Sequence, residues 1–337
     1  MKALGVHVYG GGFLYGLTNM AQVVGSVETF ELPAPLRHAI MPNVPDLTFS
    51  SPFPYADVIV SNPPCSRFSG MSCNRYSQDQ KRSVQHFPEM MEVLDVVKTV
   101  RPRLFCWETG PLLYSQPAMI ISVHDYLKTM FPHVTTLMVS YNLLSSGLPQ
   151  KRRRNHIFHF LEPMQVLGLP VLTPNFAGRI QDLESELNYL TPEPYTYHLK
   201  PDESTMDHYY RMLEANSFNA LKPVMFMEDT PVFLTVLSGR CFGWAERERW
   251  FAREEYAALM GYPLRSGENI DRDYITMLSK SVSPAASEQL FTQMIAPAMA
   301  SGKLDGPKKP TQIADKVYQY YEKVDTPKAM AVRDRMS

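Results

Sequence analysis

The sequence predicts an α/β protein built around a mainly parallel, doubly wound sheet, and two observations carry this prediction. First, short apolar runs alternate with segments of helical periodicity over the first 160 residues of the 337-residue chain. Second, several of these runs end in turn residues such as Gly, Pro and Asn, as expected where a buried strand reaches the edge of a sheet. A chain of this length has room for one large α/β domain and a smaller one.

The candidate elements follow one another with short connections. Strand-like apolar runs are expected at Leu4–Tyr9, Asp57–Ser61, Leu104–Trp107, Val134–Val139 and His156–Phe160. Helical periodicity is expected at Pro88–Arg101, His124–Phe131, Ala252–Met260 and Ala285–Met299. Alternation of this kind favours parallel strands joined by helical crossovers in the first half of the chain.

The periodicity breaks down in the middle of the chain, which predicts a small inserted domain. Its part Gln181–Asn216 carries eight acidic residues against two basic ones. We expect residues 1–160 and 245–300 to form one large domain, residues 161–244 a small irregular one, and residues 301–337 a tail. The tail contains one amphipathic helix candidate, with Ile313, Val317, Tyr320 and Val324 on one face.

Charge and cysteine content narrow the possible partners and compartment. The formal net charge is −1, so any basic surface for nucleic acid must be local. The four cysteines form no CxxC pair and no Cys/His cluster with zinc spacing, which predicts no metal site and favours a reducing cytoplasm. His156 and His159 point to opposite faces of an expected strand and are interpreted as ordinary histidines. No apolar run is long enough to span a bilayer, and we expect no signal peptide because no apolar run follows a charged start.

Residues able to carry chemistry stand at the ends of the expected strands in a fixed order. Cys65 closes the turn Asn62–Cys65, where two prolines stiffen the backbone after a strand. Glu108 ends the next strand, and Arg152 and Arg154 share one face of a later one. A thiol, a carboxyl group and two guanidinium groups suit attack on carbon 6 of cytosine, with an acid near ring N3 and a carbon-5 enamine that takes up an alkyl group.

The ordered set resembles the cytosine-C5 DNA methyltransferase family, whose hallmarks are a Pro-Cys turn, a Glu-Asn-Val segment and a Gln-x-Arg-x-Arg segment. Here these correspond to Pro64-Cys65, Glu108–Gly110 and Gln150–Arg154. Arg249–Pro263 resembles a further family motif that ends in Gly-Phe-Pro. The resemblance implies a Rossmann-like S-adenosylmethionine-dependent methyltransferase fold, with residues 161–244 as a small inserted target recognition domain. It also implies that Cys65, Glu108, Arg152 and Arg154 are catalytic and that the substrate is double-stranded DNA with a flipped cytosine.

The same resemblance assigns a pocket for the donor. Tyr9–Leu17 resembles the Phe-x-Gly-x-Gly turn under the amino-acid part of S-adenosylmethionine. Glu28 matches the acid that binds the donor ribose, and Asp46-Leu47 matches the pair that reads the adenine. The donor-binding residues are expected to be Tyr9, Gly10, Gly11, Gly12, Glu28, Asp46, Leu47, Asn62, Pro63, Lys280 and Ser281.

The loop after Cys65 is expected to close on DNA and to hold the flipped base, as in the family. The expected DNA contacts are Ser66, Arg67, Arg75, Lys81, Arg82 and Gln150. The inserted domain is small and locally acidic, which is poor for phosphate affinity. Target reading is therefore expected to be short, relaxed or helped by a protein partner.

The chain departs from the family pattern at four places. Asn62 replaces a Gly, Ser66 replaces a Gln, and Thr109-Gly110 replaces Asn-Val, which we expect to loosen that loop. Lys280 stands where the family has Asn, beside the expected donor pocket. A second positive charge next to a methyl sulfonium is unfavourable, whereas the carboxylate of carboxy-S-adenosylmethionine would reverse the sign. The hypothesis is that Lys280 selects this donor and that carboxymethyl is transferred; the alternatives are a Lys280 that only reaches solvent, and a shifted alignment.

Two other functions stay open on the sequence alone. The same chemistry on RNA is one, and a non-catalytic relative that binds DNA or the donor is the other. The altered Glu-Asn-Val and Gly-Asn-Ser segments motivate the second, and the intact Cys-Glu-Arg set argues against it. By analogy only, the size suits a restriction-associated or phage modification enzyme.

Overall fold

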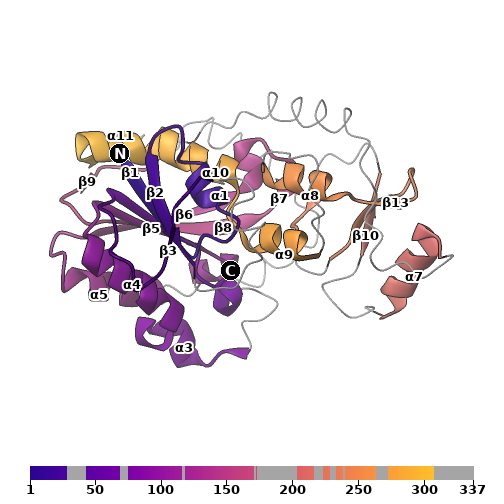
Figure 1. The fold of residues 1–337 in the computed structure, drawn as a ribbon, viewed down its shortest axis with the longest axis horizontal. Coiled ribbons are helices and arrows are strands. Elements are labelled where there is room, and N and C mark those ends of the chain that lie inside the picture. Colours follow the sequence, from indigo (N-terminus) through magenta and orange to yellow (C-terminus); the bar gives the residue numbers. More distant parts are fainter. Residues whose placement is uncertain are drawn as a thin grey trace.

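The computed structural model describes residues 1–28, 43–68, 75–115, 118–170, 172, 203–215, 223–227, 233–237, 240–262 and 272–306. Its centre is a seven-stranded sheet with the strand order β3-β2-β1-β4-β5-β8-β6 (Figure 1). Neighbouring strands run parallel except at β8, which is antiparallel to both β5 and β6. These strands are β1 (Lys2–Val6), β2 (Gln22–Val27), β3 (Asp46–Leu47), β4 (Val58–Ser61), β5 (Leu104–Thr109), β6 (Thr135–Asn142) and β8 (Arg153–Phe160).

Helices cover both faces of this sheet, as Figure 1 shows, and each face has its own apolar core. One face is covered by α4 (Pro88–Val100) and α5 (Ala118–Lys128), and the other by α1 (Gly12–Tyr15), α10 (Pro284–Leu290) and α11 (Ala296–Ser301). Strands β4 and β5 are buried along their whole length, because they lie in the middle of the sheet and are covered on both sides. The doubly wound α/β fold predicted from the sequence is confirmed.

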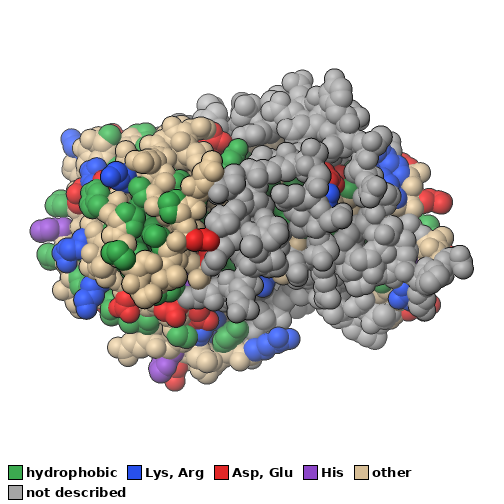
Figure 2. All heavy atoms as spheres, viewed as in Figure 1, with side chains coloured by type: hydrophobic (Ala, Val, Ile, Leu, Met, Phe, Trp, Pro, Cys, Tyr) green, Lys and Arg blue, Asp and Glu red, His purple; other side chains and the backbone are tan. Residues whose placement is uncertain are grey.

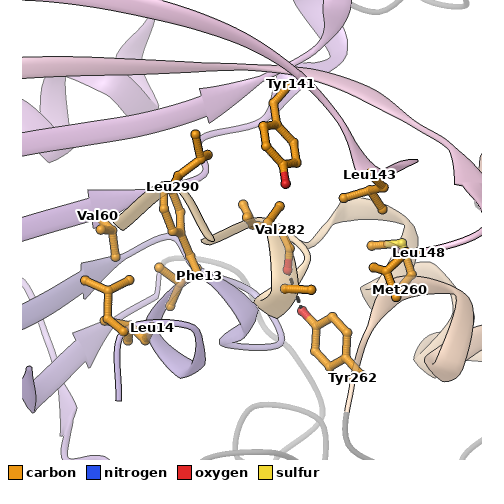
Figure 3. Packing of buried hydrophobic residues seen from close by; sticks show 14 of the residues in the cluster. Phe13, Leu14, Val60, Tyr141, Leu143, Leu148, Met260, Tyr262, Val282 and Leu290 are labelled. Atoms are coloured by element: carbon orange, nitrogen blue, oxygen red, sulfur yellow. Dashed lines mark hydrogen bonds between the residues drawn. The ribbon is translucent and has the colours of Figure 1, made fainter. Parts of the chain in front are cut away.

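The core on the α10 side joins segments from early and late in the sequence. Phe13, Val60 and Leu290 meet there between α1, the sheet and α10 (Figure 3). Helix α8 (Arg253–Met260) and helix α9 (Arg272–Lys280) add their apolar residues to the same cluster. Residues of α8, α9 and α10 therefore pack in the same core as α1 and the sheet.

A smaller part built from three strands follows the large sheet. Its strands are β10 (Val224–Phe226), β12 (Phe242–Trp244) and β13 (Arg249–Trp250), and α7 (Thr205–Ala215) packs beside β13. Phe226, Phe242 and Phe251 pack edge to face at its centre. The short strand β11 (Phe233–Leu234) pairs with β7 (Gln150–Lys151), so the small part joins the large one at the Gln-x-Arg-x-Arg segment.

The remaining short elements connect these parts. They are η1 (Cys65–Phe68), α3 (Gln78–Arg82), η3 (Val84–His86), η4 (Pro111–Ser115), η5 (Leu143–Ser146), β9 (Gln165–Val166), η6 (Phe291–Ile295) and β14 (Lys303–Leu304). Among the described helices, none is long and apolar enough to cross a membrane. Acidic and basic side chains are interspersed on the described part of the face shown in Figure 2, in keeping with the net charge of −1.

The predicted elements are present with shifted ends. Helix α5 begins six residues before the expected His124, and β5 continues through Glu108 to Thr109. The helix expected at Ala285–Met299 is interrupted by the π-helical turn η6. Pro297 explains the interruption, because it has no N–H for the carbonyl four residues earlier and the turn before it widens. The tail helix candidate at residues 313–324 lies outside the described residues.

Candidate active site

The turn that carries Cys65 lies at the carboxyl end of β4, in the middle of the sheet. The Asn62 N–H donates to the carbonyl of His7 (3.1 Å), and Asn62 Nδ2 donates to the carbonyl of Lys280 (2.6 Å). Cys65 begins the 3₁₀ turn η1 and is half-buried. The turn is therefore tied to the end of β1 and to the end of α9, and the two prolines leave its backbone little freedom.

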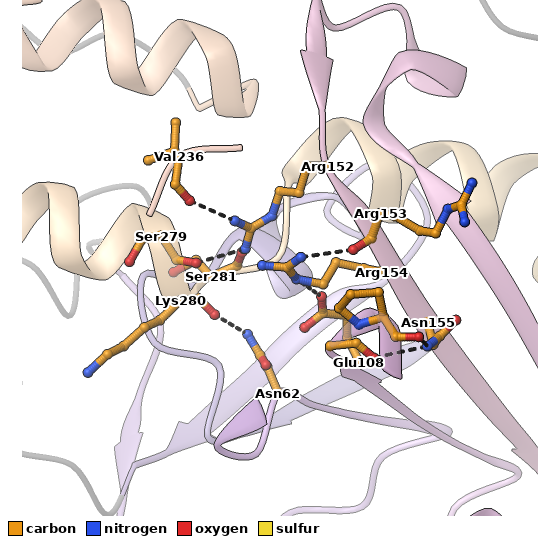
Figure 4. A network of polar contacts seen from close by, with 12 residues as sticks. Asn62, Glu108, Arg152, Arg153, Arg154, Asn155, Val236, Ser279, Lys280 and Ser281 are labelled. Carbon is orange, nitrogen blue, oxygen red and sulfur yellow. Dashed lines mark hydrogen bonds and ion pairs between the residues drawn. The ribbon is translucent and has the colours of Figure 1, made fainter. Parts of the chain in front are cut away.

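A buried carboxyl group and a guanidinium group face this turn from neighbouring strands. Glu108 on β5 is 1% exposed, and its Oε1 lies 3.1 Å from Nε of Arg154 on β8 (Figure 4). Arg154 Nη1 donates to the carbonyl of Arg153 (2.8 Å), which fixes the guanidinium orientation. The loop after Glu108 is tied down as well, because Asn155 Nδ2 donates to the carbonyls of Gly110 (2.9 Å) and Pro111 (3.2 Å). The expected loosening of this loop is therefore not seen.

The electrostatics of these groups are coupled. Burial raises the pKa of the Glu108 carboxyl group, and the nearby Arg154 and Arg152 oppose the rise. Burial also raises the pKa of the Cys65 thiol, while Arg154 and Arg152 lower it and Glu108 raises it. The structure thus brings together the thiol, the carboxyl group and the guanidinium pair. The carboxyl group is able to hold a proton, and the thiolate has cations beside it.

Arg152 is a buried clamp between three segments. Its guanidinium donates to the carbonyls of Val236 (3.2 Å), Ser279 (2.9 Å) and Ser281 (3.1 Å), as Figure 4 shows. Burial is the main cause that lowers the pKa of Arg152, to about 9, followed by the like charge of Arg154. Arg152 and Arg154 point to the same side of the strand and Arg153 is exposed, which agrees with the strand alternation in the sequence.

Gln150, which was expected on DNA, has other partners in this structure. It is fully buried, its Nε2 donates to the carbonyl of Leu259 (3.0 Å), and its Oε1 accepts from the Val236 N–H (3.4 Å). Both ends of the amide are thus used within the protein. This argues against a DNA contact and for a role in joining β7 to α8 and to the small part.

The expected DNA loop contains two buried cations and two exposed ones. The Arg67 guanidinium lies over the rings of Phe87 (4.5 Å to the centroid) and Tyr76 (5.0 Å) and donates to the carbonyl of His86 (2.9 Å). Lys81 is buried as well, so neither side chain presents its charge to a phosphate in this structure. Arg75 and Arg82 are exposed and stay available.

Ser66, next to the nucleophile, is held from the same loop. Its hydroxyl forms a 2.5 Å hydrogen bond with the phenol of Tyr76. No sequence motif marked Tyr76. The only signal in the sequence was the position of this aromatic residue directly before Ser77, the serine that caps α3.

The expected donor residues gather at the carboxyl ends of β1, β2, β3 and β4. Glu28 follows β2, and its Oε1 accepts from the Val8 N–H (2.5 Å). Asp46 and Leu47 form β3, which pairs with the end of β2, and Asp46 is exposed. Two carboxyl groups at neighbouring strand ends, beside a glycine turn, fit the hydroxyl and amine groups of an adenosine.

The glycine turn is required by the packing of the chain itself. Gly11 has φ +80°, which favours glycine, and Tyr9 also lies in the left-handed region with φ 52°. A Cβ on Gly12 would overlap the carbonyl of Val282 and the phenol of Tyr262. The packing thus accounts for glycine at these positions without a ligand, and donor contacts by the turn stay a prediction.

Lys280 and Ser281 lie between the glycine turn and the turn that carries Cys65. Ser281 Oγ accepts from the Gly10 N–H (3.1 Å), so the α9–α10 connection lies against the expected donor pocket. The Lys280 side chain is exposed and extends away from the Arg152–Glu108 network (Figure 4). No described carboxylate forms an ion pair with it.

One residue near the site was set aside as ordinary in the sequence. His156 follows Arg154 on the same face of β8 and is the direct cross-strand partner of Glu108. The two-residue period that groups Arg152 with Arg154 extends to His156 and could have revealed it. In the part of the chain that the structure describes, no group of three His, Cys, Asp or Glu side chains could hold a metal ion.

The fold that results is the Rossmann-like α/β fold of methyltransferases. An E. coli prophage protein described as a DNA modification methyltransferase is similar at a TM-score of 0.58 and 13% identity, over 89% of this chain and 99% of that one. The S. pombe Dnmt2 methyltransferase is similar at a TM-score of 0.57 and 13% identity, over 88% and 99%. The Entamoeba histolytica methyltransferase EhMeth is similar at 0.53 and 11%, over 87% and 97%. No protein-family model matches the sequence, and no curated protein matches it either.

Proposed function

We propose that this chain is a DNA cytosine-5 transferase that uses S-adenosylmethionine as its donor and Cys65 as its nucleophile. One observation carries the proposal. A half-buried thiol on a stiff turn faces a buried carboxyl group that is paired with a guanidinium group at 3.1 Å, at the carboxyl ends of adjacent strands. The similarity of the fold to DNA modification methyltransferases supports the same assignment.

Each member of this group has a defined task in the proposed reaction. The Cys65 thiolate adds to carbon 6 of a flipped cytosine. Burial raises the pKa of this thiol, and the guanidinium groups of Arg154 and Arg152 oppose the rise. Glu108, whose pKa is raised by burial, gives a proton to ring N3 and leaves an enamine at carbon 5. After alkylation, loss of the carbon-5 proton and of the thiolate restores the aromatic ring, and the N3 proton returns to the Glu108 carboxylate.

The donor pocket in this proposal lies at the ends of β1 to β4. Glu28 would hold the ribose, Asp46 and Leu47 the adenine, and the turn from Tyr9 to Gly12 the amino-acid part. Asn62, Pro63 and Ser281 would close the pocket toward the cytosine. When bound, S-adenosylmethionine supplies an electrophilic methyl group.

The direct test is to incubate the purified chain with S-adenosylmethionine and duplex DNA, digest the product and weigh the deoxycytidine. A 5-methyl product is expected, with none from Cys65→Ser. An RNA of the same sequence is the matched substrate. Product on RNA alone would replace DNA by RNA in the proposal. Absence of product on both, with no covalent adduct on DNA that contains 5-fluorocytosine, would refute the enzyme function and favour a binding module.

A second candidate concerns the donor and rests on the exposed Lys280. Its carbonyl accepts from Asn62, so the residue lies beside the nucleophile turn, and no described carboxylate neutralises its ammonium group. A free cation at this point suits a donor whose transferred carbon carries a carboxylate, such as carboxy-S-adenosylmethionine. The product would then be 5-carboxymethylcytosine.

Competition between the two donors tests this candidate. The wild type is expected to prefer carboxy-S-adenosylmethionine, and Lys280→Asn to shift the ratio of carboxymethyl to methyl product by tenfold or more toward methyl. Lys303→Asn, which removes an exposed lysine after α11, is the matched control. An unchanged ratio in Lys280→Asn would show that this lysine does not select the donor.

A further inference from the structure

His156 lies directly beside Glu108, the proposed acid, on the face of the sheet that α1 and α10 cover. In the antiparallel pair of β5 and β8 it stands opposite Glu108, and the side chains of such a pair start about 5 Å apart. Its ring contacts Phe13 edge to face (5.9 Å between centroids) and Tyr141 in the same way (6.0 Å). Phe13 directly follows the glycine turn, so the imidazole lies between the carboxyl group and the expected donor pocket.

The ring nitrogens of this histidine have no hydrogen-bond partner among the described residues, although the residue is only 1% exposed. Buried polar atoms in proteins are nearly always paired, by protein groups or by ordered water. Burial, followed by the charge of Arg154, lowers the pKa of His156 to about 3, so the ring is neutral near pH 7. A neutral imidazole has one donor and one acceptor nitrogen, and both are uncommitted here.

A second histidine on the same strand shows what a structural role looks like. His159 points to the opposite face, where its Nε2 accepts from Trp107 (3.0 Å) and its Nδ1 bonds to Thr136 (2.8 Å). Both of its nitrogens are thus satisfied. The comparison shows that the fold can pair a buried imidazole fully, and it does not do so beside Glu108.

The proposed reaction leaves one proton without an acceptor. Carbon 5 must lose its hydrogen after alkylation, while Glu108 is occupied at ring N3 and Cys65 is the leaving group. We propose, on the basis of the proposed function, that His156 relays this proton away from carbon 5 through buried water molecules bound to its two ring nitrogens.

The atoms of this step balance. The C5–H bond breaks, its electron pair forms the C5–C6 double bond, and the C6–S bond breaks with both electrons on the Cys65 sulfur. The proton passes to a water molecule and then to the acceptor nitrogen of His156. The other nitrogen releases a proton to a second water molecule, and the imidazole ends neutral in its other tautomer.

The test separates the steps before and after alkylation. DNA with 5-fluorocytosine has no proton to lose, so the reaction stops at the alkylated adduct with Cys65. His156→Phe is expected to form this adduct at the wild-type rate. On ordinary cytosine the same variant is expected to turn over at least tenfold more slowly, to accumulate the adduct, and to show a larger isotope effect with deuterium at carbon 5.

The matched control is His159→Phe, which removes the other buried imidazole from the same strand. It is expected to change the two rates together, in proportion to its loss of folded protein in thermal unfolding. If His156→Phe does not fold, His156→Gln keeps a polar side chain that can bond to the proposed water molecules but removes the two-tautomer exchange, with the same expected split.

Equal rates of adduct formation and turnover in the His156 variants, both unchanged or both reduced, would overturn the relay. Absence of any adduct in the wild type would instead overturn the proposed function and the relay with it. A slow turnover with normal trapping supports the relay, because a merely structural defect would slow both.

Discussion

The clamp formed by Arg152 makes a prediction that unfolding experiments can measure. Arg152→Met keeps most of the side-chain volume but removes the three hydrogen bonds to the carbonyls of Val236, Ser279 and Ser281. Bonds from a charged donor contribute about 1.5 to 3 kcal/mol each, so their loss costs roughly 4.5 to 9 kcal/mol. Removal of a buried charge returns several kcal/mol. We expect a net loss of about 2 to 4 kcal/mol in the free energy of unfolding.

The assay is urea unfolding followed by tryptophan fluorescence, with Arg153→Met as the matched control. Arg153 is exposed on the other side of the same strand, so its change is expected to stay within about 0.5 kcal/mol. Donor binding measured by calorimetry should weaken in Arg152→Met, because Ser281 also holds the glycine turn. If both variants unfold at the same urea concentration, the three carbonyls do not depend on Arg152 and the reasoning is refuted.

Three other perturbations follow from the structure. Gln150→Met is expected to lower the free energy of unfolding by about 2 to 4 kcal/mol, because it leaves a buried carbonyl and a buried N–H unpaired, while the DNA affinity of the folded protein at fixed salt stays unchanged. Burial lowers the pKa of His156 from 6.5 to about 3 in the folded chain. Between these two pH values only the unfolded chain binds the proton, so the free energy of unfolding falls as the pH is lowered. His156→Phe should reduce this pH dependence of stability by up to about 1.4 kcal/mol per pH unit. Gly12→Ala is expected to lower the melting temperature and to abolish donor binding, because its Cβ would overlap Val282 and Tyr262.

Each of these has a result that would contradict it. A Gln150 variant with wild-type stability and a weaker DNA affinity would return this residue to the DNA interface. An unchanged stability profile between pH 6 and 4 in the His156 variant would mean that the imidazole is protonated in the folded chain. A Gly12→Ala protein that binds S-adenosylmethionine with wild-type affinity would show that the turn can move away from Val282.

The local part of the architecture was predictable from the sequence. Strand periodicity placed Arg152 and Arg154 on one face, and the turn chemistry of Asn62–Cys65 placed the thiol at a strand end. These inferences worked because a two-residue alternation and the restricted backbone of proline depend only on neighbouring residues. The order of the motifs then indicated which strand ends meet.

The partners of the polar side chains were not predictable in the same way. Gln150 was assigned to DNA, but its amide bonds to a carbonyl 109 residues later in the chain. Arg67 was assigned to DNA, but Phe87 and the carbonyl of His86 enclose its guanidinium. Such contacts depend on how distant segments meet after folding, and no local pattern records that.

Strand β8, which is antiparallel to both of its neighbours, limits which changes of strand register this site tolerates. Because β8 is antiparallel to β5, it begins at the edge of the sheet where β4 and β5 end. Arg152, Arg154 and His156 therefore lie on the side of the thiol and the acid. A shift of β8 by one residue against β5 would exchange the two faces of this segment. Lys151, Arg153 and Asn155 would then lie on the side of Cys65 and Glu108, and both guanidinium groups and the histidine would turn to the opposite side. The register of β8 is therefore as strict a requirement for the proposed site as the identity of Cys65.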